Sequence, residues 1–184
     1  DINAYASYVN SIGGNIRLEV GEQDSLTYIA AEKLFMRGDN DGARRSLVNY
    51  LQTFPEGAFS SNANFYLGSI AFAKKEFDEA VQRFKSVIAS GDTKFLEESV
   101  ARTAEIEYLG NDYPAALESF KRLQIVAENP ENKQAARLGI MRCALQTGQQ
   151  KDALLAADEL LKEPKLSPEL EAEARYVRAK AYID

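Results

Sequence analysis

The sequence predicts an all-α solenoid, built from pairs of helices that stack one after another. Three observations predict this fold class. Small residues recur at a nearly constant interval, because the alanines at 43, 80, 116 and 153 are separated by 37, 36 and 37 residues. Apolar residues lie at helical spacing on both sides of each of these alanines. Turn-forming residues separate the helical segments.

These four residues, called the anchor alanines below, share a local pattern. "FDEAVQRF" around Ala80 matches "YPAALESF" around Ala116, with an aromatic residue, two residues, alanine, three residues and phenylalanine. "NDGARRSL" around Ala43 and "QKDALLAA" around Ala153 fit the same frame. The residues eight positions before the anchors are all apolar: Phe35, Phe72, Tyr108 and Leu145. Each unit therefore has a helix on either side of a short turn.

Turn and capping residues set the helix bounds. Gly38-Asp39-Asn40, Asn111-Asp112 and Thr147-Gly148 fall between the two helices of a unit, and Pro130 and Pro168 fall where a new first helix begins. We expect helix pairs at 25–37 with 41–53, 60–74 with 77–90, 94–109 with 114–127, and 131–146 with 150–162, and a further first helix at 168–182.

The segment before the first pair is different. Ile2, Tyr5, Val9 and Ile12 make a helical stripe that stops at Gly13-Gly14. After it, residues 15–23 alternate like a strand too short to pair alone. We expect residues 1–24 to form the second helix of a partial unit and a linker.

The repeat resembles the tetratricopeptide repeat (TPR) family across about residues 25–184. The second unit carries the signature best, with Leu67-Gly68, Phe72, the stretch Phe77 to Ala80, and Phe84. The chain departs from the signature in three ways. It has no tryptophan, and Asn64 and Val100 stand at the usual tryptophan position. Glu107 replaces a large apolar residue, and the units exceed the usual length of about 34 residues. The resemblance implies a right-handed superhelix of about four units, at about 25–57, 58–93, 94–129 and 130–166, with a lone first helix at 167–184.

The TPR resemblance also implies a concave groove that binds a peptide or protein segment. Its lining would come from the residues 8, 11 and 15 positions before each anchor alanine: Tyr28, Glu32, Phe35, Phe65, Ser69, Phe72, Ala101, Glu105, Tyr108, Leu138, Arg142 and Leu145. We expect Tyr28, Phe65, Phe72 and Tyr108 to contribute most to binding. The alternative is that such aromatic residues belong to the core, and this applies more to Phe35 and Phe72 than to Tyr28 and Tyr108.

The sequence argues against catalysis and against nucleic acid. There is no histidine, and Cys143 lies in a predicted helix without an imidazole to activate it, so a small core residue is the simpler interpretation. No cofactor or metal motif is present. With 28 acidic and 22 basic residues the net charge is −6, and no basic cluster forms a stripe for phosphates.

We therefore expect a non-catalytic scaffold for a protein or peptide partner. The unit length and the connection "FPEGAFSSNANFYLG" are similar to TPR units of bacterial cell-envelope proteins, namely the Tol–Pal-associated periplasmic protein and the outer-membrane assembly lipoprotein, which favours a periplasmic or envelope setting over the cytoplasm. A glycan-capture protein and a cytoplasmic adaptor or co-chaperone are the alternatives. Tyr176, Val177, Ala181 and Tyr182 would form an uncovered apolar face on the last helix, which indicates a longer repeat protein or self-association.

Overall fold

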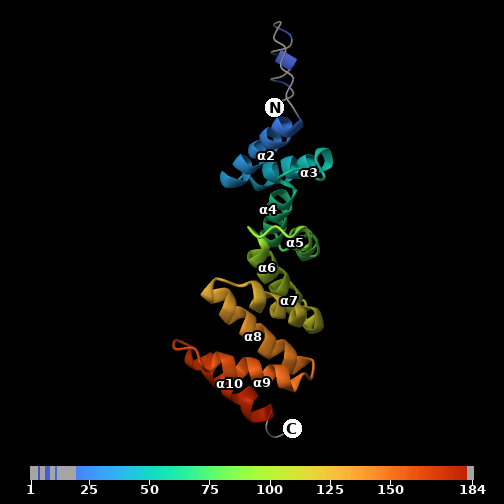
Figure 1. Cartoon of the computed structure of the whole chain (residues 1–184). Helices are drawn as coiled ribbons and strands as arrows, with labels where there is room; N and C mark the ends of the chain where they lie inside the picture. Colours follow the sequence, from blue (N-terminus) through green and yellow to red (C-terminus); the bar gives the residue numbers. More distant parts are fainter. Residues whose placement is uncertain (1–3, 5–6, 9–10, 12–19, 182–184) are drawn as a thin grey trace. The chain divides into compact units, whose positions relative to one another are not determined.

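The computed structural model describes residues 4, 7, 8, 11 and 20–181, and over this part of the chain the regular structure is helical throughout (Figure 1). The predicted all-α fold class is confirmed. The expected stripe at Ile2, Tyr5, Val9 and Ile12, the strand-like residues 15–19 and Tyr182 lie outside the described residues. Contacts divide the chain into two compact units, residues 1–90 and 91–184, which are described separately.

In the first unit, α2 (Val20–Met36) pairs with α3 (Asn40–Thr53), and α4 (Ser60–Ala73) pairs with α5 (Phe77–Ser90). Helix α3 also packs on α4, which joins the two pairs. The predicted helices agree with these bounds within one or two residues, except that α2 begins five residues earlier than expected. The sequence "VGEQD" therefore belongs to the helix, and its expected strand-like character is wrong for residues 20–23.

In the second unit, α6 (Leu96–Leu109) pairs with α7 (Tyr113–Val126), and α8 (Pro130–Gln146) pairs with α9 (Gln150–Leu160). Helix α10 (Pro168–Ala181) follows and packs on α9 and, less extensively, on α8. The first helices of the two pairs, α6 and α8, also contact each other. This contact brings together the side chains that form the site described below.

The turn inside each pair repeats the same backbone geometry. The residue five positions before each anchor alanine has a positive φ, at Gly38, Lys75, Asn111 and Gly148. The next residue donates its backbone N–H to the carbonyl five residues back, as in Asp112 to Glu107 at 2.9 Å. This is the bonding pattern of a Schellman turn, which ends the first helix and reverses the chain. The anchor alanines that follow are all buried, so the four crossings are equivalent and the predicted repeat is confirmed.

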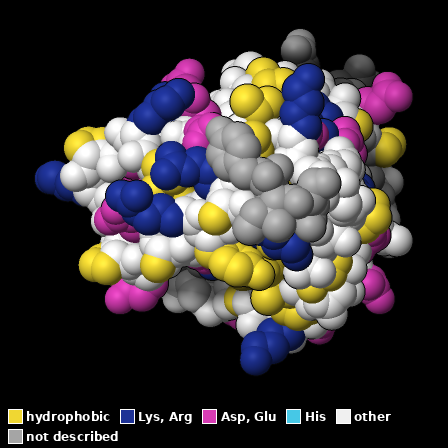
Figure 2. Space-filling model, turned by 90° about the horizontal axis from the view of Figure 1, so that it is seen from below, with side chains coloured by type: hydrophobic (Ala, Val, Ile, Leu, Met, Phe, Trp, Pro, Cys, Tyr) yellow, Lys and Arg dark blue, Asp and Glu magenta, His cyan; other side chains and the backbone are white. Residues whose placement is uncertain are grey.

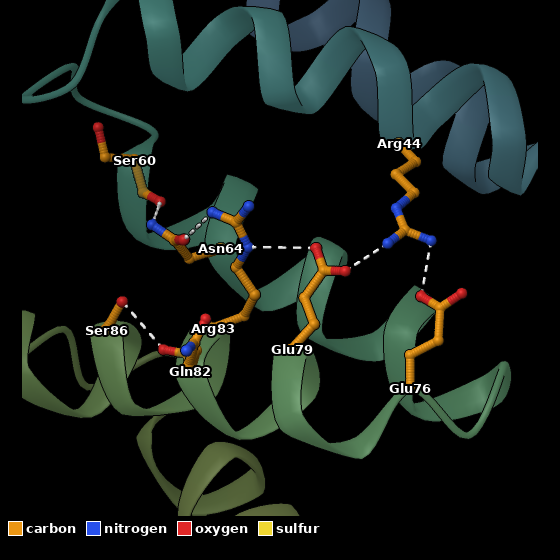
Figure 3. A network of polar contacts seen from close by, with 8 residues as sticks. All are labelled: Arg44, Ser60, Asn64, Glu76, Glu79, Gln82, Arg83 and Ser86. Carbon is orange, nitrogen blue, oxygen red and sulfur yellow. Dashed lines mark hydrogen bonds and ion pairs between the residues drawn. The ribbon is translucent and has the colours of Figure 1, made fainter.

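Polar residues replace two of the large residues that the TPR signature would place in the core. The Asn64 amide donates to the Ser60 carbonyl at 2.9 Å, and its oxygen accepts from Arg83 at 3.2 Å. Arg83 also forms an ion pair with Glu79, and Glu79 forms a second ion pair with Arg44 of α3 (Figure 3). Glu107 is buried, and its carboxylate accepts from the Ser119 hydroxyl at 2.6 Å. The polar groups are thus satisfied by hydrogen bonds.

The last helix corrects one expectation. Val177 is only 2% exposed, so it packs within the unit and does not belong to an uncovered apolar face, whereas Tyr176 is 63% exposed. Ala174, about one turn earlier on the same helix, is also buried.

On the face seen in Figure 2, hydrophobic side chains lie singly or in small groups among basic and acidic ones. No helix in the described ranges is both long and apolar enough to cross a membrane.

Sequence reasoning missed a clasp between successive pairs. Three of the four residues 19 positions before the anchor alanines bond to the connection that follows their own pair: Asp24, Glu97 and Gln134. The fourth, Ser61, bonds to Ser90 at the end of α5. Asp24 accepts from the backbone of Ala58 at 2.8 Å and from the Tyr50 hydroxyl. Glu97 accepts from the backbone of Glu128 at 2.9 Å, the backbone of Asn129 at 3.2 Å and the Asn132 amide at 2.7 Å.

The Glu97 clasp generates a prediction about stability. Burial opposes the charge of Glu97, but the bonds from Glu128, Asn132 and Asn129 outweigh it and lower the pKa of the carboxyl. A lowered folded-state pKa contributes stability that is present at neutral pH and is lost as the pH falls through the acidic range. Glu97→Gln should therefore lower the free energy of unfolding by about 1–2 kcal/mol at pH 7.

Urea unfolding at several pH values checks this prediction. The difference between wild type and Glu97→Gln should shrink as the pH falls from 7 to below the ordinary carboxyl pKa of 4.5. Glu131→Gln, which changes an exposed acid in the first turn of α8, is the matched control and should have a smaller effect. A difference that stays constant across this pH range would show that the ionised clasp does not contribute.

Candidate protein-binding groove

The residues predicted to line a groove fall into two sets, one in each unit, and their surroundings differ. The first unit contains Tyr28, Glu32, Phe35, Phe65, Ser69 and Phe72, on α2 and α4. The second unit contains Ala101, Glu105, Tyr108, Leu138, Arg142 and Leu145, on α6 and α8. Their role in binding stays a prediction, and their surroundings are given below.

In the first unit, Tyr28 is a packing residue. It is only 2% exposed, so it belongs to the core, although the sequence favoured this alternative more for Phe35 and Phe72. Its ring stacks on Phe59 with 4.4 Å between centroids and meets Tyr50 edge-on at 5.8 Å. Its hydroxyl donates to Glu32 at 2.6 Å and accepts from Asn62 at 3.1 Å. Burial, with the bond to Glu32, raises the pKa of Tyr28, so the hydroxyl stays protonated as a donor.

A second tyrosine of this unit, Tyr66, packs between α4 and α2. The ring of Tyr66, on α4, lies 4.6 Å from Phe35 of α2, centroid to centroid. Its hydroxyl donates to Glu32 at 3.1 Å, so one carboxylate holds two phenols. Burial and this bond raise the pKa of Tyr66.

Other predicted aromatic residues of the first unit also contact rings of the unit itself. Phe65 lies 6.1 Å from Phe84, and Phe72 lies 6.0 Å from Phe77. Phe35, Phe65, Ser69 and Phe72 are half-buried. Much of the aromatic stripe on α2 and α4 is therefore used for packing, which is the alternative that the sequence left open.

In the second unit, the equivalent space is open. A groove of about 280 Å³ lies between α6 and α8, with Phe120 and Leu123 of α7 among its lining residues. This α6–α8 groove includes five of the predicted residues, which are Ala101, Glu105, Tyr108, Leu138 and Arg142. Leu145 is half-buried but does not belong to its lining. Aromatic and aliphatic walls with a few polar groups are typical of sites that bind other molecules.

The charged residues of the groove are held by ion pairs. Arg102 donates to Glu98 at 2.8 Å and to Glu105 at 3.0 Å, both on its own helix. Arg142 donates to both carboxylate oxygens of Glu173 at 2.7 and 2.8 Å, which ties α8 to α10. This pairing, with burial opposing it, raises the pKa of Arg142, and it lowers the pKa of Glu173. Such bidentate pairs fix the orientation of a guanidinium group.

Three substitutions between equivalent positions explain why one unit is closed and the other open. Ala101 has the same place before its anchor alanine that Tyr28 has in the first unit. Ala135 and Gly139 correspond in the same way to Asn62 and Tyr66 of the first unit. All three small residues line the groove. The ring of Phe120 lies beside Gly139, so the groove is open at Ala101 and Ala135, where the first unit has Tyr28 and Asn62.

Packing also explains why a glycine is found at position 139. A Cβ atom at this position would lie 2.4 Å from the ring of Phe120, so the ring occupies the space beside the glycine backbone. Sequence reasoning considered the positions 8, 11 and 15 before each anchor and missed the positions 14 and 18 before it. A comparison of the residues 14 positions before the anchors, which are Ile29, Tyr66, Arg102 and Gly139, could have shown that the last repeat lacks a side chain there.

Comparison with known proteins identifies the fold. No protein-family model matches the sequence, and no curated protein sequence is significantly similar to it. Solved structures do match. YrrB, described as a TPR protein with an unusual peptide-binding site, is 18% identical over 85% of this chain and 75% of its own, with a TM-score of 0.64.

Two further structures are similar to the same extent. A tetratricopeptide repeat protein from Parabacteroides merdae is 18% identical, with a TM-score of 0.65 over 86% of this chain and 60% of its own. MamA is 17% identical, with a TM-score of 0.63 over 89% of this chain and 88% of its own. At such identities the likeness concerns the fold. The chain therefore has the tetratricopeptide repeat fold.

Proposed function

We propose that this chain is a non-catalytic scaffold that binds a short segment of another protein in the α6–α8 groove. The observation that carries the proposal is the contrast between the units, because the same repeat positions are filled by the chain's own side chains in one and left open in the other. YrrB, a structural neighbour, is described as having a peptide-binding site. The proposal places such a site on this chain.

The groove offers the chemistry that peptide binding requires. Tyr108, Leu138 and Phe120 supply apolar contact area, and Leu109 on the rim is 56% exposed. The ion pairs of Arg102 and Arg142 hold the polar groups in place before a partner arrives. Groups that are already ordered lose less conformational entropy on binding.

The non-catalytic part of the proposal rests on the side chains available. The chain has no histidine, which is the commonest general base. Cys143 is buried, as predicted for a core residue, and burial raises the pKa of its thiol to about 11, so the reactive thiolate is scarce at neutral pH. The described residues contain no group of three or more side chains that could hold a metal ion.

A bacterial cell-envelope setting is the finer part of the proposal. It is supported by the unit length of 36 to 37 residues and by the connection before α4, which are similar to envelope TPR proteins. Self-association through α10 also stays a prediction, with the exposed Tyr176 as its candidate contact. Fractionation of the source cells with an antibody to the chain tests the compartment. Recovery in the cytoplasmic fraction would contradict the envelope setting.

Closing the groove tests the binding proposal. Ala101→Tyr places on α6 the residue that the first unit has at the equivalent position, and it should occupy the opening between α6 and α8. Peptides selected from a random displayed library on the wild-type chain should bind this variant about tenfold more weakly or worse, which corresponds to about 1.4 kcal/mol.

Leu155→Tyr is the matched control, since it adds the same side chain at an exposed position of α9, a helix that contributes no described residue to the groove lining. Circular dichroism and urea unfolding establish that both variants fold. Selected peptides that bind Ala101→Tyr as tightly as the wild type would contradict the proposal, while the fold assignment would stand.

A further inference from the structure

We propose that the segment bound in the α6–α8 groove carries a basic side chain, lysine or arginine, next to the apolar side chain that enters the groove. This inference rests on the proposed function and specifies the chemistry of the partner. It follows from the charges at the groove, where carboxylates outnumber guanidinium groups.

Three carboxylates and two guanidinium groups meet at the groove. On α6, Arg102 is shared by two carboxylates, at 2.8 Å from Glu98 and 3.0 Å from Glu105, and all three residues belong to the lining. On α8, Arg142 is held by both carboxylate oxygens of Glu173, so this pair is neutral. The α6 side therefore keeps one negative charge that the lining does not balance.

Charged residues just outside the lining do not remove this excess. Glu97, next to Glu98 in the sequence, interacts with Lys133 of α8, and the two contribute one charge of each sign. Further basic side chains of α7 and α8 pair with carboxylates outside the lining, Lys121 with Asp152 and Arg137 with Glu163.

The excess charge lies beside the opening of the groove. Ala101, where the groove is open, follows Glu98 by three residues and precedes Glu105 by four, so the three side chains share one face of α6. The two carboxylate side chains are 44% and 46% exposed, within reach of a partner. A side chain seated over Ala101 thus has a carboxylate one turn away in either direction along the helix.

The apolar part of the groove has room for a side chain. Ala101 on α6 faces Ala135 and Leu138 on α8, and Leu123 of α7 contributes to the lining. The volume of about 280 Å³ is at the small end for ligand sites, which suits one side chain of a segment better than a whole helix. The neighbouring residues of such a segment would then lie at the rim.

A basic residue suits this rim better than an acidic one. Lysine and arginine keep their aliphatic stems on apolar surface while the charged group reaches a carboxylate. An acidic residue would lie beside Glu98 and Glu105, and both guanidinium groups of the lining are already paired with carboxylates of the chain. Charges at the rim of a site chiefly decide which partners are accepted.

Peptide selection is the first test. Peptides selected from a random displayed library on the wild-type chain should be enriched in lysine or arginine beside an apolar residue, relative to the unselected library. A synthetic selected peptide should bind more weakly as the salt concentration rises, because exposed charges are screened. Replacing its basic residue by glutamate should weaken binding about threefold to tenfold, as expected for exposed ion pairs.

A double variant with both Glu98→Gln and Glu105→Gln is the second test. It leaves Arg102 as the charge of the α6 rim, so it should bind the glutamate form of the peptide more tightly than the basic form. A merely structural effect would weaken both forms alike. The matched control carries Glu118→Gln and Glu131→Gln, which remove two exposed carboxylates outside the lining, and it should keep the preference for the basic form.

Three results would overturn the inference: selected peptides without an excess of basic residues, a double variant that still prefers the basic form, or a control that loses the preference equally. These failures differ from failure of the proposed function. If the selected peptides still lose affinity for Ala101→Tyr, the groove binds peptides and only the basic residue is wrongly assigned. If they bind Ala101→Tyr as tightly as the wild type, the proposed function fails and the inference fails with it.

Discussion

The close contact between the two helices of each pair is the constraint on which this structure depends. Ala80 and the other anchor alanines are buried at the crossings, where a larger side chain would force the helices apart. The Schellman turn before each crossing fixes how the second helix returns along the first. Since both features repeat, residues at a given position before the anchor occupy equivalent places on the backbone of each pair. A side chain can then change there without changing the scaffold.

The functional contrast between the units follows from this equivalence. Tyr28 and Ala101 occupy the same position of the repeat, yet Tyr28 is packed against its own unit and Ala101 lines an open groove. The space between the first helices of a unit can therefore belong to the core or be an open surface, depending on a few side chains. The scaffold supplies rigid walls in both cases, and the ion pair of Arg142 with Glu173 adds a fixed polar edge in the second unit.

The helices could be predicted from sequence because their signals are local and repeated. The turn residues and the apolar periodicity placed α3 to α10 within a few residues. Exposure was harder to predict, since it depends on neighbours distant in sequence: Tyr28 is buried by Phe59, a residue of the connection before α4. The clasp of Glu97 escaped prediction for the same reason, because its partners lie far along the chain, in the connection before α8 and in α8 itself. Five predicted residues line the groove, but its opening depends on the small side chains of Ala101 and Ala135, where the first unit has Tyr28 and Asn62.

A large-to-small change in the closed unit tests the central claim most directly. Tyr28→Ala gives the first unit the residue that the second unit has at this position, and it should open the space beside Phe59, Glu32 and Asn62. In the folded variant, titration with the peptides selected on the wild-type chain, followed by NMR, should reveal a second site, with new signal shifts at α2 and α4 in addition to those at α6 and α8. A folded variant whose α2 and α4 signals do not respond to these peptides would contradict the account.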